Sequence, residues 1–340
     1  MGEVARCMTI AHALLRRWPD TQVHFALSSA APYAAEVPFP STLLPSSPTF
    51  HPREVASLIA NLRPTTVLFD NAGRTRQLEA ARAAGARVIY ISSRRRQRRK
   101  AFRLRWMRLL DAHWIAYPSF IAGPLSRLER LKLHLLGRPR VEYLDALLPL
   151  HDAALAAAVL GRFGVHAGEY VLVVPGGGTS HAGAQHSPAT LAQAARGLAQ
   201  RGHATLLVGV EPGAEPAAVA QLSLTRRLPV AELCELIRGA RLVIANGGDT
   251  LLQVVASRRP CIAVPMAKDQ AHRIACCIEA GAALAGGADA AALEARALAL
   301  LEDHDRYEQL QRRLTQVELH NALERVADAI RDLELGAPSA

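Results

Sequence analysis

The sequence predicts an α/β protein built from two doubly wound, Rossmann-like domains, and three observations lead to this prediction. Short runs of β-branched residues alternate with longer stretches rich in Ala and Leu, which is the pattern of parallel strands connected by helices. The chain has 340 residues, a comfortable length for two domains of ordinary size. Half of the residues are hydrophobic but only 5% are aromatic, so both cores should consist mainly of Ala, Leu, Val and Ile.

Eight segments have the length and composition of buried strands. In the first half they are residues 22–27, 66–70, 87–92 and 113–117, and in the second half residues 170–174, 204–209, 242–245 and 261–264. Helices are expected between them, at residues 52–62, 74–84, 188–200, 230–238, 251–257 and 269–280. Each strand of the second half runs into a loop that contains Gly or Pro, which is where ligands bind in open α/β sheets.

The join between the two domains is expected in the turn-rich, charged segment of residues 137–168. We place an N-terminal domain at residues 1–150 and a C-terminal domain at residues 151–340, the latter including amphipathic helices between residues 303 and 335. A doubly wound domain normally begins with a strand, a glycine loop and a helix, whereas residues 1–6 run directly into a helical pattern. We therefore expect either a first strand upstream of this start, which we prefer, or a first sheet that lacks that strand.

The net charge of +10 comes from one short segment. Without the nine basic residues of this segment, the 40 Lys and Arg residues fall to 31, against 30 acidic ones, so the rest of the chain is nearly neutral. A basic surface spread over the whole protein, as in many nucleic-acid-binding proteins, is therefore excluded. The nine residues are Arg94, Arg95, Arg96, Arg98, Arg99, Lys100, Arg103, Arg105 and Arg108.

This basic segment has an amphipathic pattern, because Phe102, Trp106, Leu109 and Leu110 recur at helical spacing. A basic helix with aromatic residues is typical of contact with an anionic membrane surface. The alternatives are a solvated helix face over a core-facing stripe and a clamp for an acidic acceptor, while nucleic acid is disfavoured. The patch for a membrane or an acceptor is expected at Arg95, Arg96, Arg98, Arg99 and Arg103.

Three loops of the second half have residues suited to binding a phosphorylated ligand. The strand at residues 171–174 leads into residues 176–180 (Gly-Gly-Gly-Thr-Ser), and the strand at 242–245 leads into residues 246–250 (Asn-Gly-Gly-Asp-Thr). Glycine lets the backbone approach a ligand, and N–H groups with hydroxyls cradle phosphate oxygens. The third loop ends in Lys-Asp-Gln at residues 268–270. Ordinary turns and helix capping by Asp249 or Thr250 are the alternatives.

In this order, the three loops resemble the C-terminal domain of GT-B glycosyltransferases over residues 170–282. The nearest patterns are those of the N-acetylglucosaminyltransferase that forms lipid II and of the nucleotide-sugar hydrolase of pseudaminic acid synthesis. The resemblance implies that the two glycine loops hold the donor diphosphate and that the third loop reaches the sugar. One departure is Gln253, where the transferases carry a Glu that binds the ribose. The implied binding residues are Gly177, Gly178, Thr179, Ser180, Gly247, Gly248, Asp249, Thr250, Gln253, Asp269 and Gln270.

The first residues also resemble the hydrolase, whose Gly-His-x-x-Arg-Cys segment is similar to residues 2–7, with Glu3 in the place of the catalytic His. Glu3 is therefore a candidate general base, and we expect burial to raise its pKa toward neutrality. Asp70, at the end of a predicted strand, is the second catalytic candidate. Capping of a following helix is the alternative for both residues.

The resemblance implies transfer of a sugar from a nucleoside diphosphate donor, expected to be a UDP-sugar, to an acceptor bound by the N-terminal domain. A membrane lipid or a cell-envelope glycan is one candidate acceptor. The alternatives are a nucleotide-sugar hydrolase and a non-catalytic nucleotide-binding protein. No cofactor or metal is expected. The odd count of five cysteines, without a secretory signal or a membrane-spanning run, predicts a cytoplasmic protein with reduced thiols, with peripheral attachment to the inner membrane face as an extension.

Overall fold

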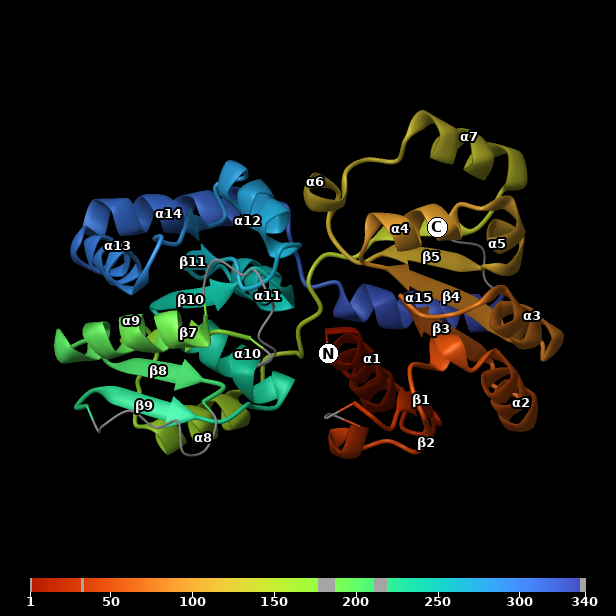
Figure 1. The fold of residues 1–340 in the computed structure, drawn as a ribbon, viewed down its shortest axis with the longest axis horizontal. Coiled ribbons are helices and arrows are strands. Elements are labelled where there is room, and N and C mark those ends of the chain that lie inside the picture. The colour runs from red at the N-terminus through yellow and green to blue at the C-terminus, as the bar shows by residue number, and fades with distance from the viewer. Residues whose placement is uncertain (1, 32–33, 177–186, 211–218, 337–340) are drawn as a thin grey trace. The chain divides into compact units, whose positions relative to one another are not determined.

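The computed structural model describes residues 2–31, 34–176, 187–210 and 219–336. The chain forms two compact units, and Figure 1 labels most of their elements. Unit 1 contains Met1–Leu147 and Ala322–Ala340, and unit 2 contains Leu148–Asn321. The first crossing from one unit to the other thus lies inside the segment expected to join the domains.

Unit 1 contains parallel strands flanked by helices. Four strands form one sheet in the order β3-β4-β5-β6, and β1 and β2 form a separate two-stranded sheet. In chain order the elements are α1 (Gly2–Arg17), β1 (Phe25–Ser28), η1 (Ala34–Glu36), β2 (Ser41–Leu44), η2 (Pro48–Phe50), α2 (Pro52–Leu62), β3 (Thr66–Asp70), α3 (Thr75–Ala83), β4 (Arg87–Ser92), α4 (Arg95–Ala101), α5 (Leu104–Leu109), β5 (Ala112–Ile115), α6 (Ser119–Ala122), α7 (Arg127–Leu136), β6 (Arg140–Tyr143) and α15 (Leu323–Leu335).

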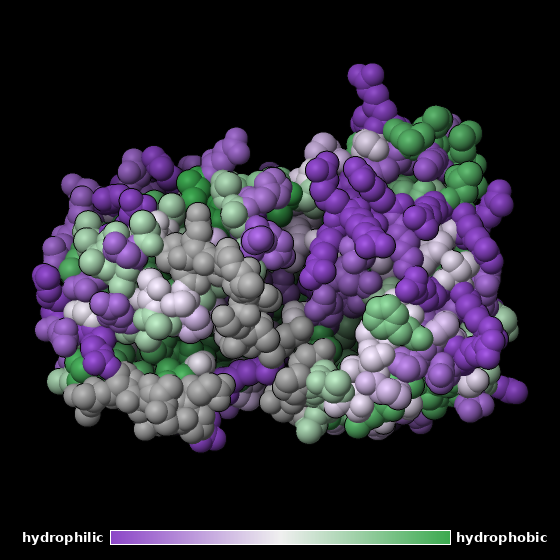
Figure 2. Space-filling model, viewed as in Figure 1, coloured by the Kyte–Doolittle hydropathy of each residue, from purple (hydrophilic) through white to green (hydrophobic). Residues whose placement is uncertain are grey.

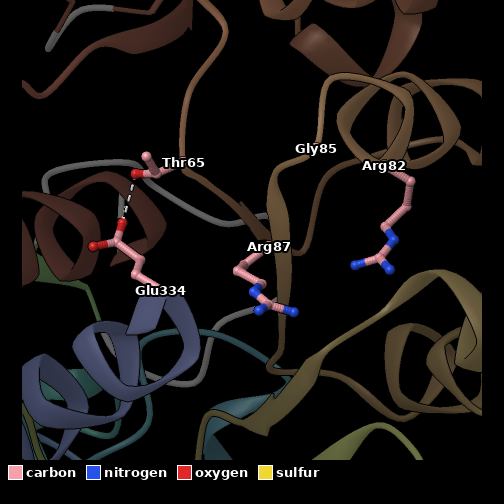
Figure 3. Close-up of a pocket in the computed structure, with 5 residues that line it drawn as sticks. All are labelled: Thr65, Arg82, Gly85, Arg87 and Glu334. Carbon is pink, nitrogen blue, oxygen red and sulfur yellow. Dashed lines mark hydrogen bonds between the residues drawn. The ribbon is translucent and has the colours of Figure 1, made fainter. Parts of the chain in front are cut away.

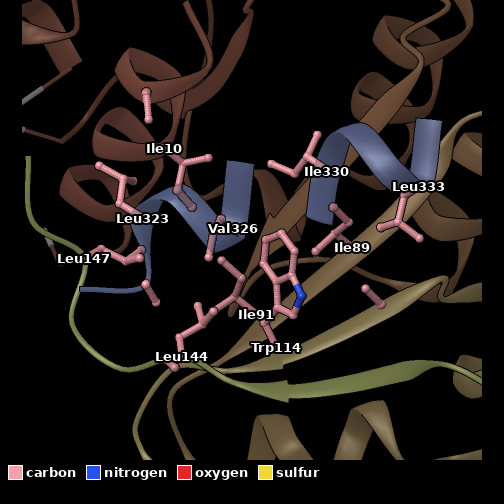
Figure 4. Packing of buried hydrophobic residues seen from close by; sticks show 14 residues of the cluster. Ile10, Ile89, Ile91, Trp114, Leu144, Leu147, Leu323, Val326, Ile330 and Leu333 are labelled. Atoms are coloured by element: carbon pink, nitrogen blue, oxygen red, sulfur yellow. The ribbon is translucent and has the colours of Figure 1, made fainter. Parts of the chain in front are cut away.

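Both faces of the unit 1 sheet are covered, which explains why β4 and β5 read as continuous apolar runs. On one face, Val88 and Tyr90 pack with residues of α2, α3 and α5. On the other, Ile89, Ile91 and Trp114 pack with α1 and α15. Figure 4 shows this second core, in which side chains of α15 lie against those of the strands.

The last helix, α15, belongs to unit 1, whereas the sequence pattern placed all C-terminal helices in the second domain. The reason is its apolar face. Its buried residues Leu323, Val326, Ile330 and Leu333 recur every three or four positions, so they share one side of the helix and fit the sheet. The chain therefore leaves unit 1, builds unit 2 and returns.

In the described part of unit 2, six parallel strands form one sheet, in the order β12-β11-β10-β7-β8-β9. From β7, in the middle of the sheet, the chain adds β8 and β9 on one side. It then adds β10, β11 and β12 on the other side of β7. The order therefore reverses between β7 and β10. Its elements are α8 (Ala153–Phe163), β7 (Val171–Val174), α9 (Pro188–Gln200), β8 (Thr205–Val208), β9 (Leu222–Thr225), α10 (Val230–Gly239), β10 (Leu242–Asn246), α11 (Asp249–Ala256), β11 (Cys261–Val264), α12 (Gln270–Glu279), β12 (Leu284–Ala285), α13 (Ala290–Glu302) and α14 (His304–Gln316).

The two chain segments that cross between the units are hydrogen bonded to each other. The Asn321 amide accepts from the Leu148 N–H at 3.1 Å and donates to the Leu148 carbonyl at 2.8 Å. One residue on, the Ala322 N–H donates to the Ala146 carbonyl at 2.9 Å. The start and the end of unit 2 are therefore fastened together. None of the helices in the described ranges is long and apolar enough to cross a membrane.

Candidate functional site

In unit 2 the candidate site lies where the strand order reverses, because crevices for ligands form at such points in open α/β sheets. Here the loops that follow β7 and β10 come close together. Asn246, at the end of β10, is buried and its amide donates to the Val174 carbonyl at 3.4 Å. A Cβ atom at Gly176 would be 2.8 Å from the amide nitrogen of Asn246, and the φ of Gly176 is +109°. Glycine at 176 therefore allows this close approach of the loops.

The loop after β10 is braced by side chains of α12. The amide oxygen of Gln270 accepts from the N–H groups of Gly247, at 3.2 Å, and of Met266, at 2.8 Å. It therefore ties the loop after β10 to the loop after β11. Buried Arg273, one turn further along α12, donates to the Gly247 carbonyl. Two side chains of one helix thus fix the shape of the glycine loop.

Both glycines of this loop are required by the packing of the protein itself. A Cβ atom at Gly247 would lie 2.7 Å from Ile274, and one at Gly248 would lie 2.5 Å from the amide oxygen of Asn246. That oxygen also accepts the Gly248 N–H at 2.7 Å. The two glycines are therefore not evidence of a ligand by themselves, and it is the position of the loop that supports a binding site.

The other predicted donor residues occupy the following places. Asp249 and Thr250 form the first turn of α11, and Gly248 is its N-cap, so neither side chain occupies the cap position. Gln253 lies one turn further on and is half-buried. The Asp269 side chain is 63% exposed. The amide oxygen of Gln270 is engaged within the protein rather than free for a sugar, and Gly177, Gly178, Thr179 and Ser180 lie outside the described residues.

In unit 1 the two predicted catalytic residues come together at the carboxyl end of β3. Arg6 of α1 pairs with Asp70 through its Nε, 2.7 Å from Oδ2, and its Nη2, 3.2 Å from Oδ1. The side chains of this pair are 8% and 4% exposed. The pair therefore fixes the first turns of α1, which carry Glu3, against the end of β3.

Asn71 connects Glu3 to Asp70 and to the next strand. Its amide nitrogen lies 3.3 Å from Oε1 of Glu3, 3.2 Å from Oδ1 of Asp70 and 2.6 Å from Oγ of Ser93. Its amide oxygen accepts the Ser93 N–H at 2.8 Å. The φ of Asn71 is +53°, a left-handed conformation that Asn tolerates better than most residues. Asn71 was not among the predicted site residues, although its position directly after Asp70 was the available signal.

The expected rise in the pKa of Glu3 is wrong. Burial of the Glu3 carboxyl does raise its pKa, but the hydrogen bond from its own backbone N–H and the positive charges of the N-terminal amine, Arg6 and Arg94 act in the opposite direction. They outweigh burial, and the pKa of Glu3 lies below its ordinary value. Glu3 is therefore an ionised carboxylate at neutral pH, which can accept a proton but is a weak base.

The basic segment forms α4, α5 and the residues beside them. Arg98 is engaged within unit 1, because it pairs with Glu129 at 2.8 Å and donates to the carbonyls of Ala122, Gly123 and Pro124. The other residues of the predicted patch are exposed, and they form no ion pair within the described part of the chain: Arg95, Arg96, Arg99 and Arg103. Figure 2 shows a broad hydrophilic surface over α4.

Two adjoining hollows of about 360 and 370 Å³ lie in unit 1 at the starts of β3 and β4, away from Glu3 and Asp70. Figure 3 shows the first, where the Thr65 hydroxyl donates to Glu334 at 2.6 Å and the side chains of Arg82 and Arg87 line the opposite part. Arg82 pairs with Asp111 at 2.8 Å. None of the predicted site residues lines either hollow.

No family model matches the chain, and no curated protein matches it. Solved structures match the chain. One is UGT2 of Phytolacca americana complexed with UDP-2-fluoro-glucose and pterostilbene, and this protein is 14% identical to the chain with a TM-score of 0.65. The match covers 98% of this chain and 97% of that one. The SsfS6 glycosyltransferase of Streptomyces sp. SF2575, complexed with thymidine diphosphate, is 13% identical with a TM-score of 0.61, over 97% and 95% of the two chains.

A third solved structure, assigned as a UDP-N-acetylglucosamine 2-epimerase of Listeria monocytogenes, is 14% identical with a TM-score of 0.60, over 99% of this chain and 95% of that chain. At such low identity the likeness shows the fold alone. The more specific resemblance to the lipid II-forming transferase and to the hydrolase stays a prediction. The chain has the GT-B fold, with two Rossmann-like α/β units, as its sequence predicted.

Proposed function

We propose that the chain transfers a sugar from a nucleoside diphosphate donor, a UDP-sugar in the first instance, to a hydroxyl group of an acceptor. The observation that supports this most is the position of the braced glycine loop. It follows β10 at the point where the strand order of unit 2 reverses, and it leads into the first turn of α11. Solved structures of the same fold include complexes with UDP-2-fluoro-glucose and with thymidine diphosphate.

Unit 2 is proposed to bind the donor. The first N–H groups of a helix have no partner within the helix and carry a partial positive charge, so those of α11 suit a diphosphate. The Thr250 hydroxyl lies in this first turn, and residues 177–180 are proposed to hold the phosphate oxygens from the other loop. Gln253 is assigned to the ribose and exposed Asp269 to a sugar hydroxyl, while Gln270 is assigned to bracing.

Unit 1 is proposed to bind the acceptor. The Glu3 carboxylate takes the proton of the acceptor hydroxyl, whose oxygen then forms a bond to the anomeric carbon of the sugar. The bond from that carbon to the diphosphate oxygen breaks, and the negative charge on the leaving diphosphate is stabilised by the loops of unit 2. Asp70 acts indirectly, because it holds Arg6 and thereby the helix that carries Glu3.

We extend the proposal to an acceptor at a membrane surface or in the cell envelope. The support is α7, a helix without any buried residue. Its residues Leu128, Leu131 and Leu135 are 59%, 52% and 72% exposed and share one face of the helix, beside the exposed Arg127 and Arg130. Figure 2 shows hydrophobic side chains over α7. An apolar stripe with flanking cations suits the headgroup region of an anionic bilayer.

The experiment is incubation with a panel of nucleoside diphosphate sugars without any acceptor, combined with calorimetric titration of the free nucleoside diphosphates. We expect binding with slow release of diphosphate. Rapid release would favour the hydrolase, and binding of no nucleotide would contradict donor binding altogether. Thr250→Val should weaken binding, whereas Thr315→Val, an exposed threonine of α14, should leave it unchanged. Equal affinities of the two variants would place the donor elsewhere.

A further inference from the structure

The two adjoining hollows of unit 1 lie at the starts of β3, β4 and β6, and we name the second one the arginine hollow. Its lining comes from the end of α3, the starts of β4 and β6, the residue before β5 and the end of α15. It shares Arg82 and Arg87 with the first hollow, which Figure 3 shows. The charged residues that line the arginine hollow are Arg82, Arg87, Arg138, Arg140, Asp111 and Asp332.

A single carboxylate orients three of these arginines. Oδ2 of Asp111 lies 2.8 Å from Nη1 of Arg82, and its Oδ1 lies 3.2 Å from Nη2 of Arg138. Arg87 is farther away, with its Nη1 3.8 Å from the same Oδ1. The Asp111 side chain is 9% exposed and also accepts the Val88 N–H of β4 at 2.8 Å, so the sheet fixes its position. Each guanidinium has five N–H donors, so the three together offer far more than one carboxylate accepts.

The arginine hollow has an excess of positive charge. Four arginines line it, against the two carboxylates of Asp111 and Asp332. Glu334, in the neighbouring hollow, pairs with Arg331 at 3.9 Å and so does not offset this excess. A phosphate monoester carries about 1.5 to 2 negative charges at neutral pH, whereas a diester has lost one of its ionisable oxygens. A monoester therefore matches the charge of the hollow.

The two hollows have room for more than a phosphate group. Their volumes are about 360 and 370 Å³, at the lower end of the roughly 300–1,000 Å³ of small-molecule sites. The first hollow contains the Thr65 hydroxyl and the Glu334 carboxylate, 2.6 Å apart, and both groups can bind the hydroxyls of a sugar. Because Arg87 lines both hollows, a phosphate beside it can carry an organic part into the first one.

The arginine hollow lies at the opposite end of the sheet from the proposed general base. Asp70 is at the carboxyl end of β3, where it is paired with Ile91 of β4. A strand rises by roughly 3.3 Å per residue, so the two ends of β4, Arg87 and Ser92, are on the order of 17 Å apart. A small molecule in the hollow is therefore too far from Glu3 to be the acceptor of the sugar.

We infer that the arginine hollow binds the phosphate of a sugar phosphate, whose hydroxyl groups lie against Thr65 and Glu334 in the neighbouring hollow. Guanidinium forks match phosphate oxygens in pairs, which suits a cluster of oriented arginines. The ligand joins the starts of β4 and β6 to the last turn of α15, so its binding stabilises the docking of that helix. This site does not depend on the proposed function.

The test is calorimetric titration of the full chain with glucose 6-phosphate, inorganic phosphate and glucose. We expect one glucose 6-phosphate per chain, weaker binding of inorganic phosphate and no binding of glucose. Arg87→Gln/Arg140→Gln should lower the affinity for glucose 6-phosphate about tenfold or more for each arginine. The matched control, Arg53→Gln/Arg108→Gln, removes two exposed arginines that line neither hollow, and its affinity should equal that of wild type.

Two further measurements separate the parts of the site. Thr65→Val removes only a hydroxyl, so it should weaken glucose 6-phosphate several-fold and leave the affinity for inorganic phosphate unchanged. Glucose 6-phosphate should also slow the amide hydrogen exchange of residues 332–336, at the end of α15, in wild type and not in the arginine variant.

Any of four results would overturn the inference. Wild type could fail to bind glucose 6-phosphate, inorganic phosphate could bind as tightly, or the control could lose as much affinity as the arginine variant. The fourth is that Thr250→Val, in the proposed donor site, abolishes binding while the arginine variant keeps it. Binding of glucose 6-phosphate without any turnover of nucleotide sugars would contradict the proposed function and leave this site standing.

Discussion

Arg6 and Asp70 form a nearly solvent-free ion pair, with Nε of the arginine 2.7 Å from Oδ2 of the aspartate. The pair joins the first helix to the end of β3, which is 64 residues away in the chain. Removing two charges from water is costly, so the pair is not in itself evidence of high stability. It does place Glu3, three residues before Arg6, next to the strand end.

Asp70→Asn should therefore destabilise the protein by about 3–5 kcal/mol, because it leaves the Arg6 charge buried without its carboxylate. Denaturant unfolding measures this change. Glu79→Gln, which breaks the exposed pair with Arg105, should cost less than about 1 kcal/mol. Equal effects of the two variants would mean that the Arg6–Asp70 pair is no more important than a surface pair.

Glu3→Gln should lower turnover about 100-fold or more while the donor affinity stays unchanged, the usual result of losing a general base. Because the pKa of Glu3 lies below its ordinary value, the wild-type rate should hold through neutral pH and fall only in acid. The same shift stabilises the fold above the pKa of Glu3 in the unfolded chain, and this stabilisation is lost as the pH falls through its folded pKa. An unchanged rate would exclude Glu3 as the general base and leave Asp70 as the candidate for that role.

Gln270→Ala should reduce both stability and nucleotide affinity, since two backbone N–H groups lose their acceptor, at about 1–3 kcal/mol for each buried group. Gln270→Glu keeps an acceptor oxygen and should restore much of the loss. Asp269→Asn removes a largely exposed ion pair with Arg273 at 3.9 Å, so it should cost less than about 1 kcal/mol of stability and raise KM for the sugar donor. Unfolding curves and initial rates distinguish these cases, and a stable Gln270→Ala protein with lost activity would favour direct contact with the sugar.

Gly248→Ala should destabilise the protein by about 1–3 kcal/mol even without nucleotide, because its Cβ would clash with buried Asn246. Gly161→Ala is the matched control. It lies in α8 with open space around its Cβ position, so the same substitution should stabilise by about 0.5–1 kcal/mol. If Gly248→Ala were as stable as wild type yet unable to bind nucleotide, the glycine would be needed only to make room for the ligand.

Replacing Leu128, Leu131 and Leu135 by Ser should weaken sedimentation with anionic vesicles by about tenfold or more, because each leucine contributes roughly 1.5–3 kcal/mol when fully buried in the bilayer. The control replaces Leu43, Leu62 and Leu335, which are exposed on other elements of unit 1. Wild type that ignores anionic vesicles at low salt would contradict the membrane proposal. Arg98 was predicted to belong to the membrane patch, but it is not replaced in this test because it pairs with Glu129.

The sequence predicted the central strands well and the outer ones poorly. The strands at residues 87–92 and 261–264 have the predicted bounds, because strands buried on both faces must be apolar throughout. The strand at residues 66–70 also has the predicted bounds, although it is an edge strand and mostly half-buried. The sequence missed four strands, β2, β6, β9 and β12, and all four lie at sheet edges. Every residue of β6, β9 and β12 is half-buried. Such strands need no continuous apolar run, so composition does not distinguish them from loops.

The candidate site could also be predicted only in part, because the sequence identifies residue types but not the contacts between them. Glu3 and Asp70 were selected as alternatives, yet their connection through Asn71 depends on contacts across more than 60 residues. Gln270 was predicted to bind sugar, but its amide oxygen accepts two backbone N–H groups of the protein. The sequence could not show this, because a motif gives the residue type and not the direction of its amide. Arg273 had no signal in the sequence beyond its place one turn later on the same helix.

The return of α15 to unit 1 affects the order in which the chain can fold as it is synthesised. Unit 2 is complete once residue 321 has left the ribosome, and the Leu148–Asn321 clasp can then close its ends. The sheet of unit 1 must wait for the last helix, with Ile89, Ile91 and Trp114 covered only in part, by α1, until it arrives. The half of the molecule that is made first is therefore finished last, and a chain released before residue 322 would expose that apolar face to aggregation.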